Sequence, residues 1–120
     1  MKVGILGAGN IAIQMAITID KLEDVENYCV ASRSIDKAKE FADKYGFRKA
    51  YGSYVEMLED KNVDLVYIAT PHSHHYEQAI ACINHGKNVL CEKAFTVNAK
   101  QAEDIFKLAK AKGVFVTEAI

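Results

Sequence analysis

Short apolar runs alternate with stretches in which hydrophobic residues recur at helical spacing, and this alternation extends along the whole chain. The runs are typical of buried β-strands, and the recurrences are typical of amphipathic helices. The pattern predicts six strands, at residues 3–6, 28–31, 48–51, 64–69, 88–91 and 114–117. It predicts helices between them at residues 10–21, 35–45, 53–59, 72–85 and 99–112. Repeated βα units of this kind favour an α/β fold with a doubly wound parallel sheet of about six strands, ordered 3-2-1-4-5-6.

Residues that typically begin or end helices stand at the boundaries of these segments. Ser34 and Ser53 are predicted N-caps, and Glu56 completes a capping box with Ser53. Asn98 is the predicted N-cap of the last helix. Three helical stripes are followed by a glycine, which readily adopts the left-handed conformation that ends a helix: Gly46, Gly86 and Gly113.

The length of 120 residues predicts one domain, residues 1–120. The composition, 50% hydrophobic and 26% charged with a formal net charge of -1, argues against a nucleic-acid partner. No apolar run approaches the roughly 20 residues of a membrane span, and Met1 does not begin a signal-peptide layout, so we expect no membrane partner. The cysteines, Cys29, Cys82 and Cys91, are odd in number and widely spaced, which indicates reduced, buried thiols and a cytoplasmic protein.

A glycine-rich turn follows the first predicted strand. Gly7-Ala8-Gly9-Asn10-Ile11-Ala12 fits the pattern G-x-G-x-x-A, between an apolar strand and the start of a helix. Gly7 permits the tight turn, Gly9 lets the backbone approach a pyrophosphate, and Ala12 lets the helix pack close to the strand. The amides of Asn10 and Ile11 begin the helix, where its dipole favours negative charge. Because both flanks agree with the motif, we predict dinucleotide binding rather than a turn that only links a strand to a helix.

The end of the second predicted strand indicates which dinucleotide is bound. NAD-binding folds usually place Asp or Glu there to accept hydrogen bonds from the ribose 2′-hydroxyl, but this chain has Ala31-Ser32-Arg33-Ser34. A guanidinium flanked by hydroxyls suits a 2′-phosphate, so Ser32 and Arg33 predict a preference for NADP, with NAD as the alternative. Arg33 could instead be a solvated cation paired with Asp36 or Glu40. The other nearby acids fall before the predicted strand, at its wrong end: Glu23, Asp24 and Glu26.

Three blocks of sequence carry a family resemblance. They are the glycine turn with its strand at residues 3–12, the segment Ala69-Thr70-Pro71 with His75 beyond it, and Gly86-Lys87-Asn88-Val89-Leu90-Cys91-Glu92-Lys93. On these blocks the whole chain resembles the N-terminal NAD(P)-binding Rossmann domain of the Gfo/Idh/MocA oxidoreductases. The third block is similar to the family segment G-K-x-V-x-x-E-K-P. Within the family, residues 50–54 and 118–120 most resemble dihydrodiol and NADP-dependent xylose dehydrogenases.

The resemblance implies roles for residues beyond the glycine turn. The Ala69-Thr70-Pro71 segment would line the crevice at the carboxyl end of the fourth predicted strand, and His75 would bind the coenzyme from the adjoining turn. Glu92 would help to fix the nicotinamide half. Lys93 would be the catalytic residue, reaching the reacting hydroxyl or carbonyl and stabilising its developing negative charge. Without the resemblance, Lys93 reads as a solvated charge after a strand.

Two positions depart from the family pattern. Ala94 replaces the proline after the lysine, and a cis peptide bond there would cost ~2.5–4 kcal/mol, so we expect a trans bond. His72 stands where the family commonly has Asn. The histidines at 72, 74 and 75 have no evident carboxylate or thiol partner nearby, so we predict no metal site.

The resemblance implies an oxidoreductase that transfers a hydride between a nicotinamide coenzyme and a sugar- or diol-type hydroxyl or carbonyl. Family members carry the substrate pocket on a C-terminal domain, which is absent from these 120 residues, so we expect nucleotide binding without turnover. A nucleotide-binding sensor and a non-catalytic relative are the alternatives. Apolar surface at the interface with the missing domain leaves a homo-oligomer open.

Overall fold

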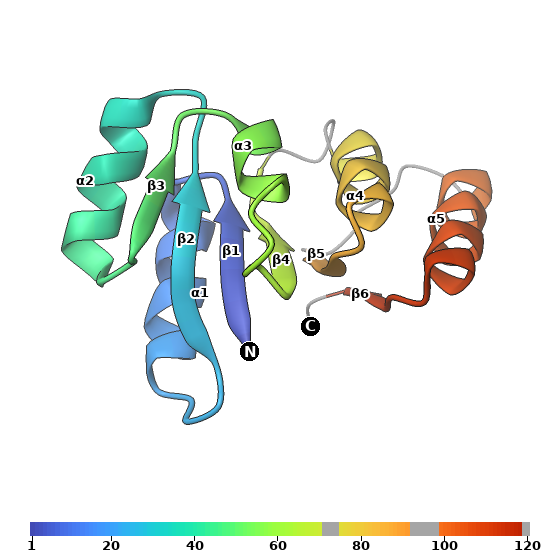
Figure 1. Cartoon of the computed structure of the whole chain (residues 1–120), viewed down its shortest axis with the longest axis horizontal. Coiled ribbons are helices and arrows are strands. Elements are labelled where there is room, and N and C mark those ends of the chain that lie inside the picture. The colour runs from blue at the N-terminus through green and yellow to red at the C-terminus, as the bar shows by residue number, and fades with distance from the viewer. Residues whose placement is uncertain (71–74, 92–98, 119–120) are drawn as a thin grey trace.

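The computed structural model describes residues 1–70, 75–91 and 99–118. In this part of the chain six parallel strands form one sheet in the order β3-β2-β1-β4-β5-β6, which confirms the predicted topology (Figure 1). The elements, in chain order, are β1 (Lys2–Leu6), α1 (Asn10–Asp20), β2 (Glu26–Ala31), α2 (Ile35–Tyr45), β3 (Lys49–Tyr51), α3 (Tyr54–Leu58), β4 (Leu65–Ile68), α4 (His75–Asn84), β5 (Asn88–Cys91), α5 (Ala99–Lys112) and β6 (Val116–Glu118).

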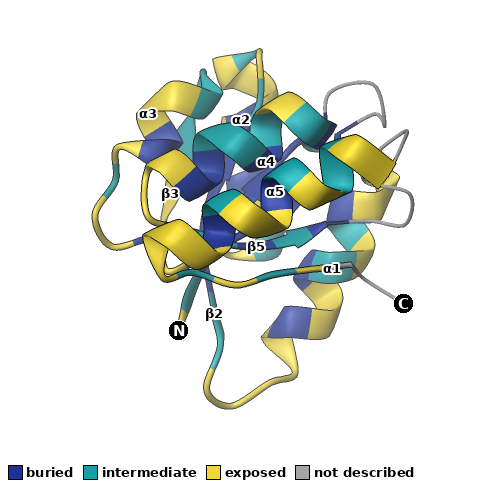
Figure 2. Ribbon diagram, turned by 90° about the vertical axis from the view of Figure 1, so that its right-hand side faces the viewer, coloured by how far each residue is buried: buried dark blue, intermediate teal, exposed yellow. Residues whose placement is uncertain are grey.

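Helices cover both faces of the sheet because strand residues point alternately to its two sides. On one face, Val3 and Ile5 of β1 pack with buried residues of α1 and α2. On the other face, Leu6 packs in a cluster with buried residues of α3, α4 and α5. Figure 2 shows the buried residues along the strands and on the helix sides that face them.

The predicted helix boundaries are largely confirmed. The Ser34 hydroxyl accepts the Lys37 N–H at 3.4 Å, and the Ser53 hydroxyl accepts the Glu56 N–H at 3.3 Å. Three glycines adopt positive φ after a helix, at 78°, 73° and 72° for Gly46, Gly86 and Gly113. The predicted N-cap Asn98 lies outside the described residues, as do the first three residues of the helix predicted from His72.

The starts of two strands differ from the prediction by two residues, and the other strand boundaries agree with it to within one residue. β2 begins at Glu26, whose N–H donates to the Met1 carbonyl at 2.8 Å, so Glu26 is the first residue of the strand rather than a residue before it. It still lies at the amino end of β2. β6 begins at Val116 rather than Val114, because the Val114 N–H donates at 3.0 Å to the Ala109 carbonyl and closes the end of α5.

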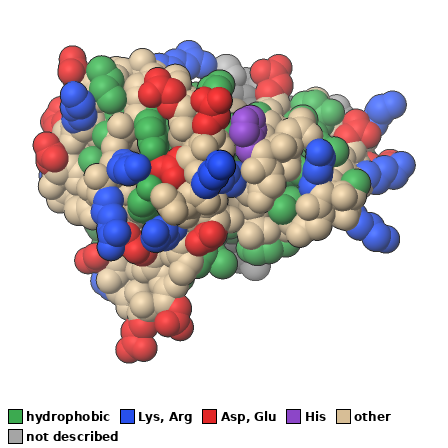
Figure 3. All heavy atoms as spheres, in the orientation of Figure 1, with side chains coloured by type: hydrophobic (Ala, Val, Ile, Leu, Met, Phe, Trp, Pro, Cys, Tyr) green, Lys and Arg blue, Asp and Glu red, His purple; other side chains and the backbone are tan. Residues whose placement is uncertain are grey.

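All three cysteines are buried, as predicted. Burial raises the pKa of Cys29 to about 12, and burial with the neighbouring Cys91 raises the pKa of Cys82 to about 12. Neither of these two thiols is activated as a nucleophile. On the surface, acidic and basic side chains are interspersed over the face seen in Figure 3. Within the described residues, no helix has the length and apolar character needed to cross a membrane.

The Asp60 carboxylate, two residues after α3, links β2 and β3 to the loop before β4 through hydrogen bonds. Asp60 accepts hydrogen bonds from the hydroxyls of Tyr51 at 2.6 Å and Tyr28 at 2.9 Å, and from the Asn62 N–H at 2.9 Å. Lys49 Nζ lies 3.9 Å from the same carboxylate, whose side chain is only 6% exposed. Burial alone would raise the pKa of Asp60, but these hydrogen bonds and the Lys49 charge hold it below its ordinary value of 3.8.

The Asp60→Asn variant is expected to be less stable than the wild-type chain by about 1–3 kcal/mol at neutral pH, because it loses a charged acceptor. The pKa of Asp60 is lower in the folded state than in the unfolded state, so the ionised carboxylate stabilises the fold at pH values above the unfolded-state pKa. This stabilisation is lost as the pH falls through the folded-state pKa, because the carboxylate becomes protonated. Urea unfolding from about pH 7 to about pH 3 should therefore show the difference in free energy of unfolding shrinking below about pH 4. A difference that stays constant across this range would contradict the assigned role.

Candidate functional site

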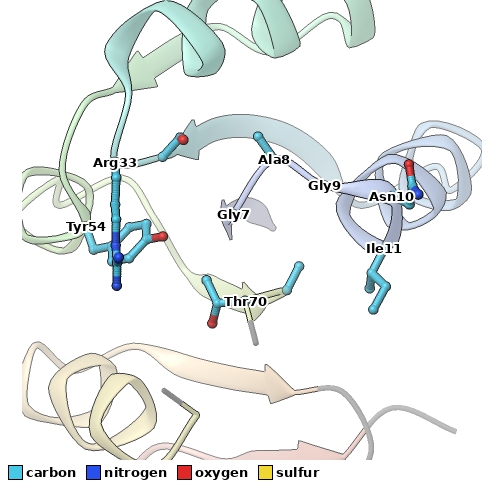
Figure 4. Close-up of a pocket in the computed structure, with 10 residues that line it drawn as sticks. Gly7, Ala8, Gly9, Asn10, Ile11, Arg33, Tyr54 and Thr70 are labelled. Atoms are coloured by element: carbon cyan, nitrogen blue, oxygen red, sulfur yellow. The ribbon is translucent and has the colours of Figure 1, made fainter. Parts of the chain in front are cut away.

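A cavity of about 680 Å³ opens at the carboxyl ends of β1, β2 and β4 (Figure 4). The strand order changes direction between β1 and β4, and open α/β sheets bind their ligands at such a point. The lining residues are Gly7, Ala8, Gly9, Asn10, Ile11, Ser32, Arg33, Tyr54, Ala69 and Thr70. Eight of these ten residues were predicted to bind the coenzyme, and the structure brings them together. The other two are Ala8 and Tyr54.

Gly7 makes the turn that leaves β1. Its φ is +105°, a backbone conformation that side chains strongly disfavour, and its N–H donates to the Ala31 carbonyl at 2.8 Å. A Cβ built at this position would lie 3.1 Å from the Ala69 carbonyl oxygen. The turn therefore requires glycine both for its backbone angle and for the close approach of the β4 end.

Gly9 is the N-cap of α1 and leaves the start of this helix open toward the cavity. A Cβ built at Gly9 would meet no atom within 4 Å, and no side chain caps the first turn, unlike the starts of α2 and α3. The first N–H groups of α1 have no partner within the helix, and its first turn contains no acidic residue. Asn10 and Ile11 line the cavity at this point. This end of the cavity can accept an anion.

Ala12 is fully buried and does not line the cavity. It packs in the cluster that joins α1 to Val3 and Ile5 of β1. Its small side chain fits the close approach of helix and strand that the motif requires.

Ser32 and Arg33 follow β2 at the other end of the cavity. The Ser32 hydroxyl accepts the Ser34 N–H at 3.3 Å, which leaves its own O–H free to donate. Arg33 is exposed and forms none of the ion pairs found among the described residues, including the alternative pairs with Asp36 and Glu40. Arg33 is the only charged residue of the ten that line the cavity, so its electrostatic field there favours anions.

Thr70 lies on the cavity wall and is held from α4. Its hydroxyl donates to the Gln78 side-chain oxygen, and His75 Nε2 lies 2.5 Å from its carbonyl oxygen. His75 is fully buried and does not line the cavity. The structure therefore places His75 behind the Thr70 backbone, where it orients that residue. The contact between His75 and the coenzyme that the resemblance implies stays a prediction.

Several predicted residues lie outside the described part of the chain. These are Pro71, Glu92 and the predicted catalytic Lys93, together with Ala94, His72 and His74. No group of three or more potential metal-binding side chains occurs among the residues that the structure describes.

Tyr54 is the lining residue outside the glycine turn that was not predicted from the sequence. It is the first residue of α3, directly after the Ser53 N-cap and close to the carboxyl end of β3. Its position after the third strand could have indicated it. The carboxyl ends of parallel strands meet at one edge of a sheet, so the residues that follow β3 lie at the same edge as Arg33, which follows β2.

A parallel sheet with a glycine turn, and with an anion-accepting cavity where the strand order changes direction, defines a Rossmann-type nucleotide-binding domain. The chain belongs to the Gfo/Idh/MocA oxidoreductases: the family model described as "Oxidoreductase family, NAD-binding Rossmann fold" matches residues 1–120. This membership confirms the resemblance inferred from the three sequence blocks.

Curated relatives are similar over the whole chain. It is 43% identical to D-xylose 1-dehydrogenase (NADP(+)) of Hypocrea jecorina, covering 100% of this chain and 34% of that protein. It is 41% identical to mouse trans-1,2-dihydrobenzene-1,2-diol dehydrogenase, covering 100% of this chain and 37% of that protein. The chain thus spans about a third of the length of these relatives.

Solved structures share the fold closely. A 3-ketoreductase from Actinomadura kijaniata, in complex with NADP and TDP-benzene, superposes with a TM-score of 0.95 at 32% identity, covering 98% of this chain and 36% of that one. A probable dehydrogenase from Thermotoga maritima gives a TM-score of 0.92 at 28% identity, covering 99% of this chain and 36% of that one.

Proposed function

We propose that this chain is the coenzyme-binding domain of an NADP-dependent oxidoreductase that acts on sugar- or diol-type hydroxyl or carbonyl groups. The observation that carries the coenzyme preference is the end of the cavity next to β2. There Arg33 and Ser32 present hydrogen-bond donors, and no carboxylate is among the lining residues that the structure describes. Family membership supports the reaction class, and the names of the relatives from Hypocrea jecorina and mouse support the substrate class.

The residues of the cavity fit the chemical parts of NADP. The open backbone at Gly9 and the first amides of α1 would hold the pyrophosphate, because no Cβ or capping side chain occupies that space. Arg33 and Ser32 would hold the 2′-phosphate, which only accepts hydrogen bonds. Thr70, oriented by His75, would form the wall beside the ribose. When bound, the nicotinamide ring supplies the position that accepts or donates the hydride.

Lys93 remains the proposed catalytic residue. Its ammonium group would donate a hydrogen bond to the reacting oxygen of the substrate, which stabilises negative charge there and positions a proton for transfer. Because the chain spans about a third of the length of its relatives, we propose that a substrate-binding region outside these 120 residues completes the active site. The 120-residue chain should then bind coenzyme without reducing it.

Thermal unfolding of the 120-residue chain with and without coenzyme tests the binding proposal. A ligand that binds only the folded state raises the Tm, and NADPH at about 100 times its Kd should stabilise the chain by about 2.7 kcal/mol. NADH at the same concentration should raise the Tm less. An unchanged Tm with both coenzymes at millimolar concentration would overturn the proposal.

The Lys93→Ala variant tests the catalytic assignment. In the longer protein that includes a substrate-binding region, this variant should lower turnover of sugars or trans-diols by about 100-fold or more, because a general acid–base group contributes roughly that much. Its Kd for NADPH should stay close to the wild-type value. Turnover that survives the substitution would remove Lys93 from the mechanism. Wild-type protein that binds NADPH but turns over none of the sugars and trans-diols tested would favour the sensor alternative.

A further inference from the structure

A side groove of about 410 Å³ continues the cavity between α3 and the first turn of α4. The groove and the cavity share two residues, Arg33 and Tyr54, which therefore stand at the junction between them. Figure 4 shows the Arg33 side chain extending past the Tyr54 ring, with the tyrosine hydroxyl directed toward the cavity. Glu77 lies on the wall of the groove. Its carboxylate disfavours an anion deeper in the groove and leaves the junction as the place where a phosphate fits.

Contacts with neighbouring residues hold Tyr54 in place. The Ser53 hydroxyl caps α3 at the residue before it, and Met57 and Leu58 bury the sheet-facing side of this short helix. The Tyr54 ring itself is partly buried against the same hydrophobic cluster. The hydroxyl is therefore presented to the cavity by a ring with little freedom to move away.

The Tyr54 hydroxyl has no hydrogen-bond partner among the residues that the structure describes. Two other tyrosines on this side of the sheet, Tyr28 and Tyr51, both donate to Asp60. Partly buried tyrosine hydroxyls usually find a partner, so an unpaired one at the edge of a ligand cavity has a donor available for the ligand.

We propose that Tyr54 is a specificity-determining residue that donates a hydrogen bond to the 2′-phosphate of NADP, beside Arg33. This inference rests on the proposed function. With Tyr54 included, the groups around the junction are the Ser32 hydroxyl, the Arg33 guanidinium and the Tyr54 hydroxyl, and each can donate. A phosphate monoester accepts hydrogen bonds at all three of its outer oxygens. A ribose 2′-hydroxyl would gain less, because the pattern that favours it includes a carboxylate acceptor.

The Tyr54→Phe variant removes one oxygen and keeps the ring that packs against the core. Tyr45→Phe is the matched control, because Tyr45 lies on α2, packs against Phe41 and does not line either cavity. Kd values for NADPH and NADH are measured by coenzyme fluorescence for the wild type and both variants. Displacement of NADPH by 2′,5′-ADP then locates any effect at the phosphorylated adenosine end.

Tyr54→Phe should weaken binding of NADPH and of 2′,5′-ADP by about tenfold, the loss typical of one hydrogen bond to a charged group, and should change the Kd of NADH by less than about twofold. Tyr45→Phe should change none of these values. Unchanged NADPH affinity in Tyr54→Phe, or an equal loss for both coenzymes, would overturn the role of Tyr54 while leaving the proposed function standing. Wild-type chain that binds neither NADPH nor 2′,5′-ADP would overturn the proposed function itself. Melting curves of all three proteins establish that they are equally folded.

Discussion

Replacing Arg33 with aspartate is expected to reverse the coenzyme preference of this chain. Among the described lining residues, the substitution removes the only charged side chain, and it puts a carboxylate where the 2′-phosphate would lie. NADPH should bind about 100-fold or more weakly, because a bidentate charge-assisted contact is replaced by like-charge repulsion. NADH should bind as well as before or better, because aspartate can accept hydrogen bonds from the ribose 2′-hydroxyl. Fluorescence titration with both reduced coenzymes measures the change.

Lys110→Asp is the control for this charge reversal. It changes the net charge by the same amount, and Lys110 is exposed in the last turn of α5, just before β6 and therefore at the amino-end edge of the sheet, away from the cavity. It should leave both Kd values unchanged. If Arg33→Asp binds NADPH as tightly as the wild type does, the guanidinium is a solvated surface charge and the cavity does not discriminate through it.

Replacing Gly9 with valine is expected to remove binding of both coenzymes while the fold persists. The position has open space around a built Cβ, and its φ of -93° and ψ of -166° suit a β-branched residue. The valine methyl groups would fill the space in which the pyrophosphate approaches the backbone, so both Kd values should rise by about 100-fold, or about 2.7 kcal/mol. The Tm without coenzyme should change little.

Gly9→Ala supplies a size series at the same position, with an intermediate loss of affinity. Gly7→Ala is the contrasting variant, because at φ +105° and 3.1 Å from the Ala69 carbonyl oxygen it should lower stability as well as binding. Retained NADPH affinity in a folded Gly9→Val chain would show that the glycine turn is only a connection between β1 and α1.

Much of the fold could be predicted because each element carries its own boundary signals. Ser34, Ser53 and Gly46 interact with helix ends only a few residues away, so their roles are local. The start of β2 was missed because Glu26 and Asn27 are polar and break the apolar run. Asn27 is nevertheless buried, and its side-chain amide donates to the Ala16 carbonyl of α1 at 2.9 Å. That partner is set by tertiary structure, which periodicity does not contain.

The site residues also differ in how far the sequence alone could predict them. The glycine turn and Arg33 could be predicted because the motif and the strand end place them directly. The predicted strand order already put β3 beside β2, but no local motif marks Tyr54, so it was not singled out. For His75 the family pattern indicated importance but not location. Its burial behind the Thr70 carbonyl depends on how α4 packs against β4, so a positioning role could not be distinguished from direct contact by sequence alone.

Isothermal titration calorimetry of the folded 120-residue chain with NADPH and with NADH shows whether the cavity beside the glycine turn holds a 2′-phosphorylated dinucleotide. We expect one coenzyme per chain and a Kd at least about tenfold lower for NADPH, the difference expected from charged hydrogen bonds to the 2′-phosphate. Equal affinity for the two coenzymes would contradict the role assigned to Arg33. Absence of binding heat with both coenzymes, at concentrations where the chain is folded, would contradict coenzyme binding by this cavity.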